Sequence, residues 1–411
     1  MIGKDKIAHC AEKWNSFYLY DERGILESIE ALKSNFPQVD FLYSLKCNPN
    51  SHVLRCIFDS GFGADAASAA EVLLAYDSGV SADNIYYSAP GKTMKDIEDC
   101  IGKAVLIADS IDEIKRIQTV AARFNKVINI GIRINPNFTF AGDGGIPSKF
   151  GVDETQVLEF LKENHLANVK ISGIHIHVKS QELSAEVLAA YYKRVFEVAE
   201  KCAELCGELE FVNMGSGMGV PYSQTDTPLN LIKLHSCLKE FINEYRKNSP
   251  NTRVIIEVGR YVVCKSGIYV TKVVDRKSSY GKTYLILKNT LNGFIRPSLA
   301  RLIERYAPDG SLAGAEPLFT SKQAFDFLSL KDEAALETVT LVGNLCTASD
   351  VIAEDIQLPP LACGDVIVIT NAGSYAAVLS PFQFSLQEKP VELFLTRDGE
   401  AISSSGERTV V

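Results

Sequence analysis

The stretch Phe41-Leu-Tyr-Ser-Leu-Lys46 runs from apolar residues into a basic one, and this pattern recurs through the first 260 residues. A short apolar run that ends at polar residues is typical of a strand buried in a sheet. The runs Val127-Ile-Asn-Ile-Gly-Ile-Arg-Ile134 and Val254-Ile-Ile-Glu257 repeat it. Each predicted strand therefore places a polar side chain at or near its carboxyl end.

Helical patterns alternate with these strands. Ile25, Ile29 and Leu32 recur at helical spacing. The segments Ser68-Ala-Ala-Glu71 and Ser110-Ile-Asp-Glu113 predict helix starts with capping boxes, each just after a short strand. Repeated strand and helix units predict a parallel sheet that is covered by helices.

The number of predicted strand ends decides between two folds. Eight strand and helix units in a little over two hundred residues predict a TIM (β/α)8 barrel rather than an open doubly wound sheet. Barrel enzymes hold their active site at the carboxyl ends of the strands. The polar residues expected there are Lys46, Asp65, Ser88, Asp109, Arg133, His177, Asn213 and Glu257.

After about residue 260 the pattern changes to β-strands with few helices. Strands are expected at 261–274, 283–287, 338–342, 365–370 and 392–397, a helix at 299–306 and a loop at 309–317. The fold class is therefore α/β plus β. Two domains suit a chain of 411 residues: a TIM barrel over 23–259, and a mostly β domain over 260–411 that also takes in 1–22.

Charge and composition exclude several classes of partner. Lys and Arg total 42 and Asp and Glu total 51, which gives a net charge of −9 and argues against nucleic acid and anionic membranes. No apolar run reaches membrane-spanning length, and residues 1–6 lack the apolar stretch of a signal peptide. The ten cysteines form no C-x-x-C pair, which predicts free thiols in a reducing cytosol. We expect a cytoplasmic protein with a small-molecule substrate.

Three of the predicted strand ends together describe a cofactor site. Lys46 in a confined apolar site would lose its proton more readily and could form a Schiff base, although a surface lysine is the ordinary alternative. The glycines of Met214-Gly-Ser-Gly-Met-Gly219 would let backbone N–H groups approach a phosphate. Glu257 would need a cationic partner near that phosphate, and a pyridinium nitrogen would serve. This combination indicates pyridoxal phosphate (PLP).

His175 and His177 close the sixth predicted strand. Alternation along a strand places both side chains on one face, toward the barrel interior. Such a pair could bind a metal or could stack on a pyridine ring, and the residues alone leave both open. Since no third ligand is evident by spacing, we expect no metal.

These segments together resemble the alanine-racemase-fold family of PLP decarboxylases, which includes the diaminopimelate, ornithine, lysine and arginine decarboxylases. The resemblance extends over nearly the whole chain. It is carried by 43–48, 63–71, 174–181, 215–217, 257–260, 343–350 and 371–375. Some relatives act in siderophore and aminoglycoside-antibiotic pathways, and Cys346-Thr347 with 145–151 is most similar to that branch.

The resemblance implies a role for each matched residue. Lys46 would carry the cofactor as a Schiff base, His177 would stack on its ring, and Glu257 would pair with the ring nitrogen. Asp65, Arg133 and Ser180 would lie near the cofactor. The phosphate would be held by Gly215, Ser216, Gly217, Gly259, Arg260 and Tyr375.

The resemblance also implies a homodimer with shared active sites. Cys346 would cross the interface and protonate the substrate carbon after carbon dioxide leaves, since a thiol can give and regain a proton. Its ordinary reading is a small buried residue. Tyr375 would contact cofactor and substrate, although it could instead be a core tyrosine.

The substrate is read from two places. Arg296, in Asn292-Gly-Phe-Ile-Arg-Pro297, resembles the arginine with which diaminopimelate decarboxylases clamp the distal carboxylate, but it could be an ordinary surface arginine. Thr347 stands where those enzymes carry a glutamate for the distal ammonium. We expect a diamino acid or a larger, carboxylate-bearing amino-acid conjugate. The alternatives are meso-diaminopimelate itself, an amino-acid racemase and a non-catalytic regulatory homologue.

Other positions depart from the family pattern as well. Val258 replaces the signature proline, Ser216 replaces a glycine of the phosphate loop, and Lys288-Asn-Thr290 stands where an acidic residue and a glycine are frequent. Lys179 takes the place of a glycine and would add charge near the cofactor. None of these changes removes a catalytic group.

Overall fold

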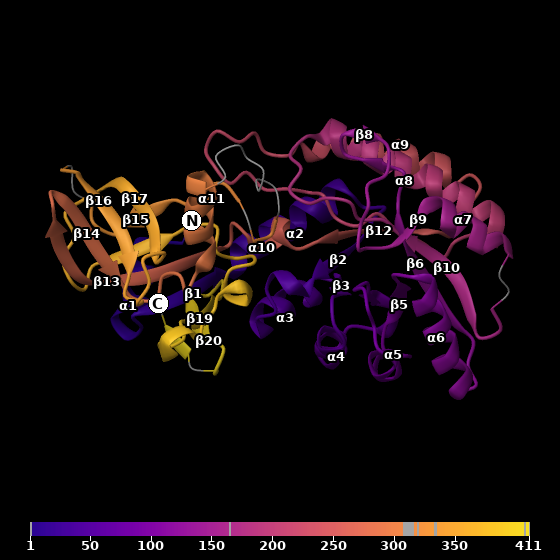
Figure 1. Cartoon of the computed structure of the whole chain (residues 1–411), viewed down its shortest axis with the longest axis horizontal. Coiled ribbons are helices and arrows are strands. Elements are labelled where there is room, and N and C mark those ends of the chain that lie inside the picture. Colours follow the sequence, from indigo (N-terminus) through magenta and orange to yellow (C-terminus); the bar gives the residue numbers. More distant parts are fainter. Residues whose placement is uncertain are drawn as a thin grey trace.

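The computed structural model describes residues 2–163, 166–306, 316–318, 320–332, 335–406 and 408–410. It contains two large β-sheets that occupy opposite ends of an elongated molecule (Figure 1). The predicted loop at 309–317 lies outside the described residues except for Glu316 and Pro317, which are in a turn.

The first sheet is a closed ring of parallel strands. Its order is β10-β11-β12-β2-β3-β4-β5-β6, and β6 pairs with β10 to close it. This confirms the predicted eight-stranded barrel. The strands are β2 (Asp40–Ser44), β3 (Gly63–Ala66), β4 (Ile85–Tyr87), β5 (Val105–Ala108), β6 (Ile128–Asn135), β10 (Val169–His175), β11 (Phe211–Asn213) and β12 (Arg253–Val258).

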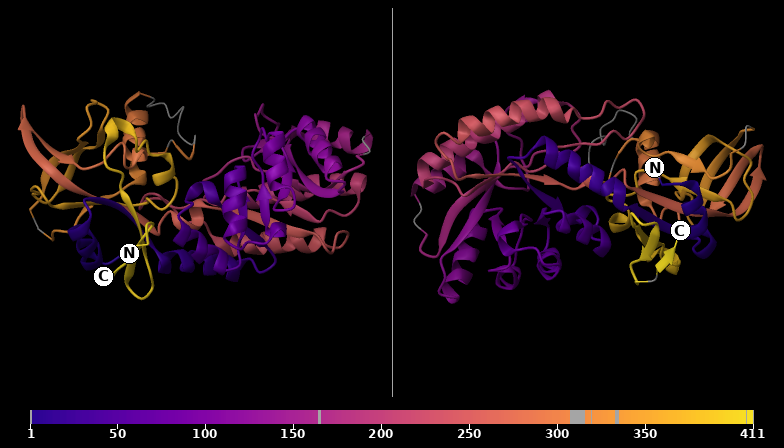
Figure 2. Two further views of the ribbon diagram at one scale, coloured as in Figure 1. Left: turned by 90° about the horizontal axis from the view of Figure 1, so that it is seen from below. Right: turned by 180° about the vertical axis from the view of Figure 1, so that it is seen from behind.

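Helices alternate with these strands and cover the barrel from outside (Figures 1 and 2). After β6 the alternation is interrupted by a short hairpin and by β9 (Val152–Asp153), which pairs with β6. The hairpin is β7 (Phe138–Thr139) with β8 (Gly142–Asp143). The helices are α2 (Glu22–Asn35), α3 (Ser51–Asp59), α4 (Ala69–Asp77), α5 (Met94–Cys100), α6 (Ile111–Arg123), α7 (Glu154–Glu163), α8 (Ala185–Cys206) and α9 (Leu231–Tyr245).

Of the two predicted capping boxes, the serine caps are confirmed, but the glutamate contacts differ from the prediction. Ser68 and Ser110 cap α4 and α6, accepting from the backbone N–H of Glu71 and Glu113. The glutamate side chains, however, accept from the N–H groups one residue before each cap, those of Ala67 and Asp109. The longer reach ties the helix start to the strand end that precedes it.

The lower part of the barrel interior is filled by apolar side chains. Phe211 lies where Gly131 of β6 and Gly173 of β10 leave room, because a Cβ at Gly173 would come within 2.4 Å of its ring. Leu42, Tyr86, Ile107 and Ile255 pack in the same cluster with Phe211. This apolar cluster closes one end of the barrel. The polar side chains lie at the other end, where the strands finish.

The second sheet is mostly antiparallel and includes the predicted strands. The order is β17-β16-β14-β13-β1-β19-β20-β21, with β18 pairing β13 and β15. Strand β1 places part of the first 22 residues in this sheet, next to β13 and β19. The strands are β1 (Ser16–Asp21), β13 (Gly267–Ser279), β14 (Lys282–Leu287), β15 (Phe327–Ser329), β16 (Glu337–Gly343), β17 (Val351–Leu358), β18 (Val366–Ile369), β19 (Val391–Leu395), β20 (Glu400–Ser403) and β21 (Arg408–Val410).

One predicted strand is wrong at its start. The prediction began at Tyr261, but β13 begins at Gly267, and α10 (Arg260–Val263) precedes it. The apolar run Tyr261-Val-Val-Cys264 is buried as a turn of helix, which its composition does not distinguish from a strand. Two further helices are α1 (Lys4–Lys13) and α11 (Ile295–Tyr306), the latter four residues longer than predicted. None of the helices in the described ranges is long and apolar enough to cross a membrane. The domain limits themselves stay a prediction.

Candidate active site

Polar residues from all eight barrel strands meet at the carboxyl ends, as predicted. Asp65, Arg133 and Glu257 lie within their strands, and Asn213 ends β11. Ser88 and Asp109 each lie one residue beyond their strands, and two positions lie two residues beyond. Lys46 lies in the 3-10 turn Leu45–Cys47 after β2, and β10 ends at His175, so His177 lies two residues beyond the strand.

Lys46 is held by an acidic residue that is completely buried. Its Nζ donates to Asp65 Oδ2 at 2.8 Å, and Ser44 and Ser88 donate to the two oxygens of the same carboxylate. Burial lowers the pKa of Lys46, but Asp65, with Tyr375 and Glu257, outweighs it and holds the pKa above its ordinary value. The expectation that Lys46 loses its proton more readily is therefore wrong for the chain alone, because the site is not apolar.

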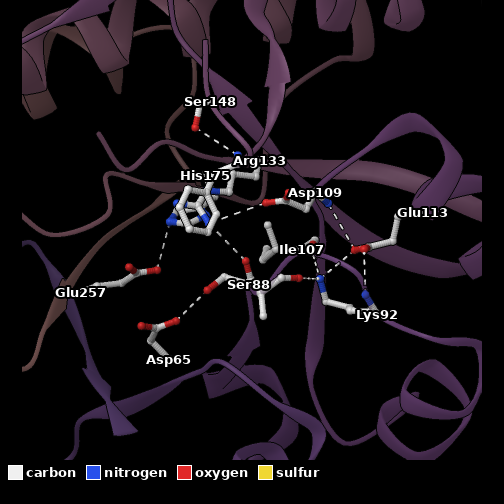
Figure 3. A network of polar contacts seen from close by, with 12 residues as sticks. Asp65, Ser88, Lys92, Ile107, Asp109, Glu113, Arg133, Ser148, His175 and Glu257 are labelled. Atoms are coloured by element: carbon white, nitrogen blue, oxygen red, sulfur yellow. Dashed lines mark hydrogen bonds and ion pairs between the residues drawn. The ribbon is translucent and has the colours of Figure 1, made fainter. Parts of the chain in front are cut away.

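Glu257 is buried between an imidazole and an amide. His175 Nε2 lies 3.2 Å from Glu257 Oε1, and Asn213 Nδ2 donates to the same oxygen at 2.9 Å. Figure 3 shows His175 pointing toward the carboxylate. Although burial raises the pKa of Glu257, the charge and hydrogen bond of His175 outweigh it, so the pKa lies well below its usual range. Glu257 is thus a fixed anion at the barrel mouth.

His177 presents a neutral ring. The backbone N–H of Ser216 donates to its Nδ1 at 3.1 Å. Burial, with Arg133 and Lys46 nearby, lowers the pKa of His177 to about 3 against the opposing effect of Glu257. An uncharged imidazole fixed in this way suits stacking on another aromatic ring.

Three glycines near His177 occupy places that a larger residue could not. Gly215 and Gly217 have φ of 63° and 145°, and a Cβ at Gly215 would lie 2.5 Å from the carbonyl oxygen of Ile176. A Cβ at Gly259 would lie 2.1 Å from Cys47 Sγ. The three glycines therefore let the backbone pack closely against its neighbours in conformations that a larger residue could not adopt, and their N–H groups are the ones that would meet a phosphate.

Arg260 supplies a buried cation beside these glycines. Its guanidinium lies 5.0 Å from the centre of the Tyr375 ring and donates to the Tyr222 hydroxyl. Tyr375 is fixed by its own N–H, which donates to the Cys47 carbonyl at 2.8 Å. Ser180 is half-buried in the loop after β10. Sequence reasoning missed Tyr222, which stands in an irregular segment with no periodic signal.

The donor set at the barrel mouth fits pyridoxal phosphate. It offers an amine on Lys46, a buried anion for a ring nitrogen on Glu257, a flat neutral ring on His177, and a cation with glycine backbone for a phosphate. These parts come from β2, β10, β11 and β12 and from the turns that follow them. Among the described residues no group of three potential metal ligands is found.

Cys346 and Thr347 lie in the loop that connects β16 and β17 of the second sheet. Cys346 is exposed, with its Sγ 3.8 Å from Ser385 Oγ, and Thr347 shares a hydrogen bond of 2.8 Å with Ser349. Within the described part of the chain, the hydrogen bonds of Lys46 do not reach this loop.

Arg296 is not the surface arginine that the alternative reading supposed. Its side chain is completely buried on α11. Glu316 Oε2 lies 3.3 Å from its Nη2 and 2.9 Å from Nη1 of Arg260. The role of Arg296 toward a substrate carboxylate stays a prediction, because the chain already gives it a carboxylate partner. No local pattern in the sequence pointed to Glu316.

A second buried ion pair, which the sequence did not predict, lies beside the residues of the barrel mouth (Figure 3). Lys92 Nζ donates to Glu113 Oε1 at 2.7 Å and to the carbonyls of Ala89 and Ile107. Glu113 accepts from the backbone of Asp109, whose carboxylate lies 3.6 Å from Arg133. Burial lowers the pKa of Lys92 against the opposing charge of Glu113. The pair joins β4 and β5 to Arg133.

Replacing Lys92 by methionine is expected to destabilise the protein strongly. Glu113 would lose its buried partner and keep, among the described cations, only Arg116, whose Nη2 lies 3.9 Å from Oε2, and breaking a buried pair costs roughly 3–5 kcal/mol of the free energy of unfolding. Urea denaturation measures this. Lys95→Met is the matched control, because Lys95 makes an exposed pair with Asp99 and should leave the stability nearly unchanged. Equal stability of the two variants would contradict the structural role of Lys92.

Comparisons with known proteins indicate the same cofactor. Residues 22–264 match the family described as pyridoxal-dependent decarboxylase, pyridoxal binding domain. The L-glutamyl-[BtrI acyl-carrier protein] decarboxylase of Niallia circulans is 31% identical over 93% of this chain and 89% of its own length. A diaminopimelate decarboxylase of Helicobacter pylori strain J99 is 29% identical over 92% and 90%. The crystal structure of the Helicobacter pylori enzyme with L-lysine is 27% identical, with a TM-score of 0.81 over 96% of this chain and 94% of that one.

Proposed function

We propose, from the premise that this chain belongs to the family of pyridoxal-dependent decarboxylases, that its substrate is an amino acid whose far end is conjugated to a larger group. The general reaction is PLP-dependent decarboxylation of an amino acid, and the enzyme is a lyase. The observation that carries the choice of substrate is the buried pairing of Arg296 with Glu316.

The residues at the barrel mouth divide the chemistry between them. When bound, PLP supplies an electron sink for the carbanion that decarboxylation leaves. Lys46 Nζ would hold its aldehyde carbon, and the Glu257 carboxylate would hold a proton on its ring nitrogen. His177 would orient the ring, while Arg260, Tyr375 and the backbone at Gly215–Gly217 would bind the phosphate. Asp65 keeps Lys46 in place through the 2.8 Å contact.

A conjugated substrate is supported by what the distal positions lack. Arg296 is engaged by an internal carboxylate, and Thr347 carries no charge with which to bind a distal ammonium. The similar Niallia circulans protein is named for a glutamyl group that is carried by an acyl-carrier protein. A glutamate joined through its γ-carboxyl has no free distal charge, so it suits a site of this kind.

Free meso-diaminopimelate is the second candidate. Several similar proteins, at 26–29% identity, are named diaminopimelate decarboxylases. That substrate would require the Arg296 guanidinium to exchange Glu316 for the substrate's distal carboxylate. It would also require a residue other than Thr347 to bind the ammonium.

We also propose that the enzyme is a homodimer with shared sites in the cytoplasm. Cys346 is exposed in the single chain, so a second copy could receive it at the mouth of its barrel. Its thiol would deliver the proton to the substrate carbon. All ten cysteines are free, which suits a reducing compartment.

The substrate proposal is tested by comparing kcat/KM for carbon dioxide release from free meso-diaminopimelate and from a γ-amide of L-glutamate. We expect kcat/KM for the amide to be higher by roughly a hundredfold. The free distal charges of diaminopimelate would find no matching partners in the site, whereas the amide brings no distal charge. L-Glutamate, L-lysine and L-ornithine serve as further free amino acids. Efficient turnover of free diaminopimelate would contradict the proposal and favour the second candidate.

A further inference from the structure

A carboxylate from the chain itself lies between two buried arginines. Glu316 Oε2 is 2.9 Å from Arg260 Nη1 and 3.3 Å from Arg296 Nη2. The Glu316 side chain is only 6% exposed, and the two arginine side chains are 5% and 0% exposed. The cluster therefore holds two cations and one anion away from water.

The Arg296 guanidinium is enclosed on several sides. Nη1 donates to the Ser374 carbonyl at 3.4 Å, and Nη2 donates to the Tyr222 hydroxyl at 3.2 Å as well as to Glu316. The rings of Phe325 and Tyr222 lie 5.5 and 5.7 Å from its central carbon. Nη2, which could take part in a fork-like contact with a carboxylate, is thus already engaged by Glu316.

Tyr222 links the two arginines and stays neutral. Its hydroxyl accepts from Arg260 and from Arg296. Burial raises the pKa of Tyr222 to about 12 in spite of the two cations. Glu316 is therefore the anion of this cluster, and a second carboxylate brought by a substrate would be placed beside a like charge.

We propose that Glu316 is a specificity-determining residue: it engages Nη2 of the guanidinium that a free distal carboxylate would need, so that the site accepts substrates with an uncharged distal group. This inference deepens the proposed function and rests on it for the location of the distal end. Separating Arg296 from Glu316 would break one of the two buried ion pairs of this carboxylate and leave it with Arg260 alone, and losing a buried ion pair is unfavourable. A free dicarboxylic amino acid would have to bring about that separation, whereas an amide or a thioester would not.

The test is the binding of glutarate to the PLP-loaded protein, measured by calorimetry. Glutarate carries a distal carboxylate but no amino group, so its binding does not depend on turnover. Glu316→Gln removes the competing charge and keeps an acceptor for the arginines. We expect this variant to bind glutarate at least about tenfold more tightly than the wild type, since a charge-assisted pair with Arg296 becomes available.

Two control variants make the result specific. Glu354→Gln removes the carboxylate that lies 3.1 Å from Arg301, in the same domain but with Glu354 41% exposed, and should bind glutarate like the wild type. Arg296→Met combined with Glu316→Gln should lose the gained affinity. If Glu316→Gln folds, loads PLP and gains no affinity, the proposal is overturned.

If Glu316→Gln fails to fold, glutarate binding by the wild type and by Arg296→Met tests the proposal instead. Absence of glutarate binding by the wild type supports the proposal, whereas binding that Arg296→Met abolishes overturns it. The proposed function alone would fail if the wild type released no carbon dioxide from the γ-amide of L-glutamate while Glu316→Gln still gained affinity for glutarate. Glutarate binding is measured without turnover, so the two failures are distinguishable.

Discussion

The Lys46→Ala protein is expected to lose the visible absorbance of lysine-bound PLP and to release carbon dioxide at least about a thousandfold more slowly than the wild type. Lys46 presents its amine at the barrel mouth, 2.8 Å from the buried Asp65 carboxylate and beneath the ring of residues that would hold the cofactor. Alanine removes the amine and leaves the carboxylate in place. Absorbance spectroscopy and carbon dioxide release measure the two effects.

The matched control for this prediction is Lys179→Ala. Lys179 is exposed in the loop that follows His177, so this variant tests whether another nearby lysine binds the cofactor. It should keep the absorbance of the lysine-bound cofactor. A borohydride-reducible lysine adduct that survives in Lys46→Ala protein would disprove the assignment of Lys46.

Mixing two inactive variants is expected to restore activity if the sites are shared. Lys46→Ala and Cys346→Ala each remove one group that the proposal makes essential, and the two groups lie on turns that follow strands of different sheets. In a mixed dimer with head-to-tail sites, one site would carry both changes and the other would carry none. Random exchange of subunits should therefore recover about a quarter of the wild-type activity.

The recovery experiment needs proof that subunits have exchanged. Mass measurement of intact dimers with one isotope-labelled variant provides it. Mixed dimers without activity would argue against shared sites and against Cys346 as the proton donor from a second copy. Each variant alone, diluted and remixed with itself, should remain inactive.

Much of the fold follows from local patterns in the sequence. The apolar runs that lead into Asn213 and Glu257 indicate where two barrel strands finish, and the structure places both side chains at the barrel mouth. Burial inside a parallel barrel requires such runs, so the pattern is strong. The start of β13 was harder to predict, because a buried helical turn and a buried strand have the same composition.

The details of the site depend on contacts that local patterns do not encode. Strand alternation was extended to His177, but β10 ends at His175, and it is His175 that meets Glu257. The expected deprotonation of Lys46 overlooked Asp65 as a charge partner, although both residues had been placed at neighbouring strand ends. The partner of Arg296 comes from a segment with no periodicity, so Glu316 could be found only in three dimensions.

The central claim is that this barrel mouth removes an α-carboxylate, and isotope labelling tests it most directly. A γ-amide of L-glutamate labelled at its α-carboxylate would be incubated with the PLP-loaded wild type and with Lys46→Ala protein. We predict one labelled carbon dioxide for each amine product from the wild type, and none from the variant. Retention of the label together with appearance of the D-enantiomer would contradict the claim and would identify a racemase instead.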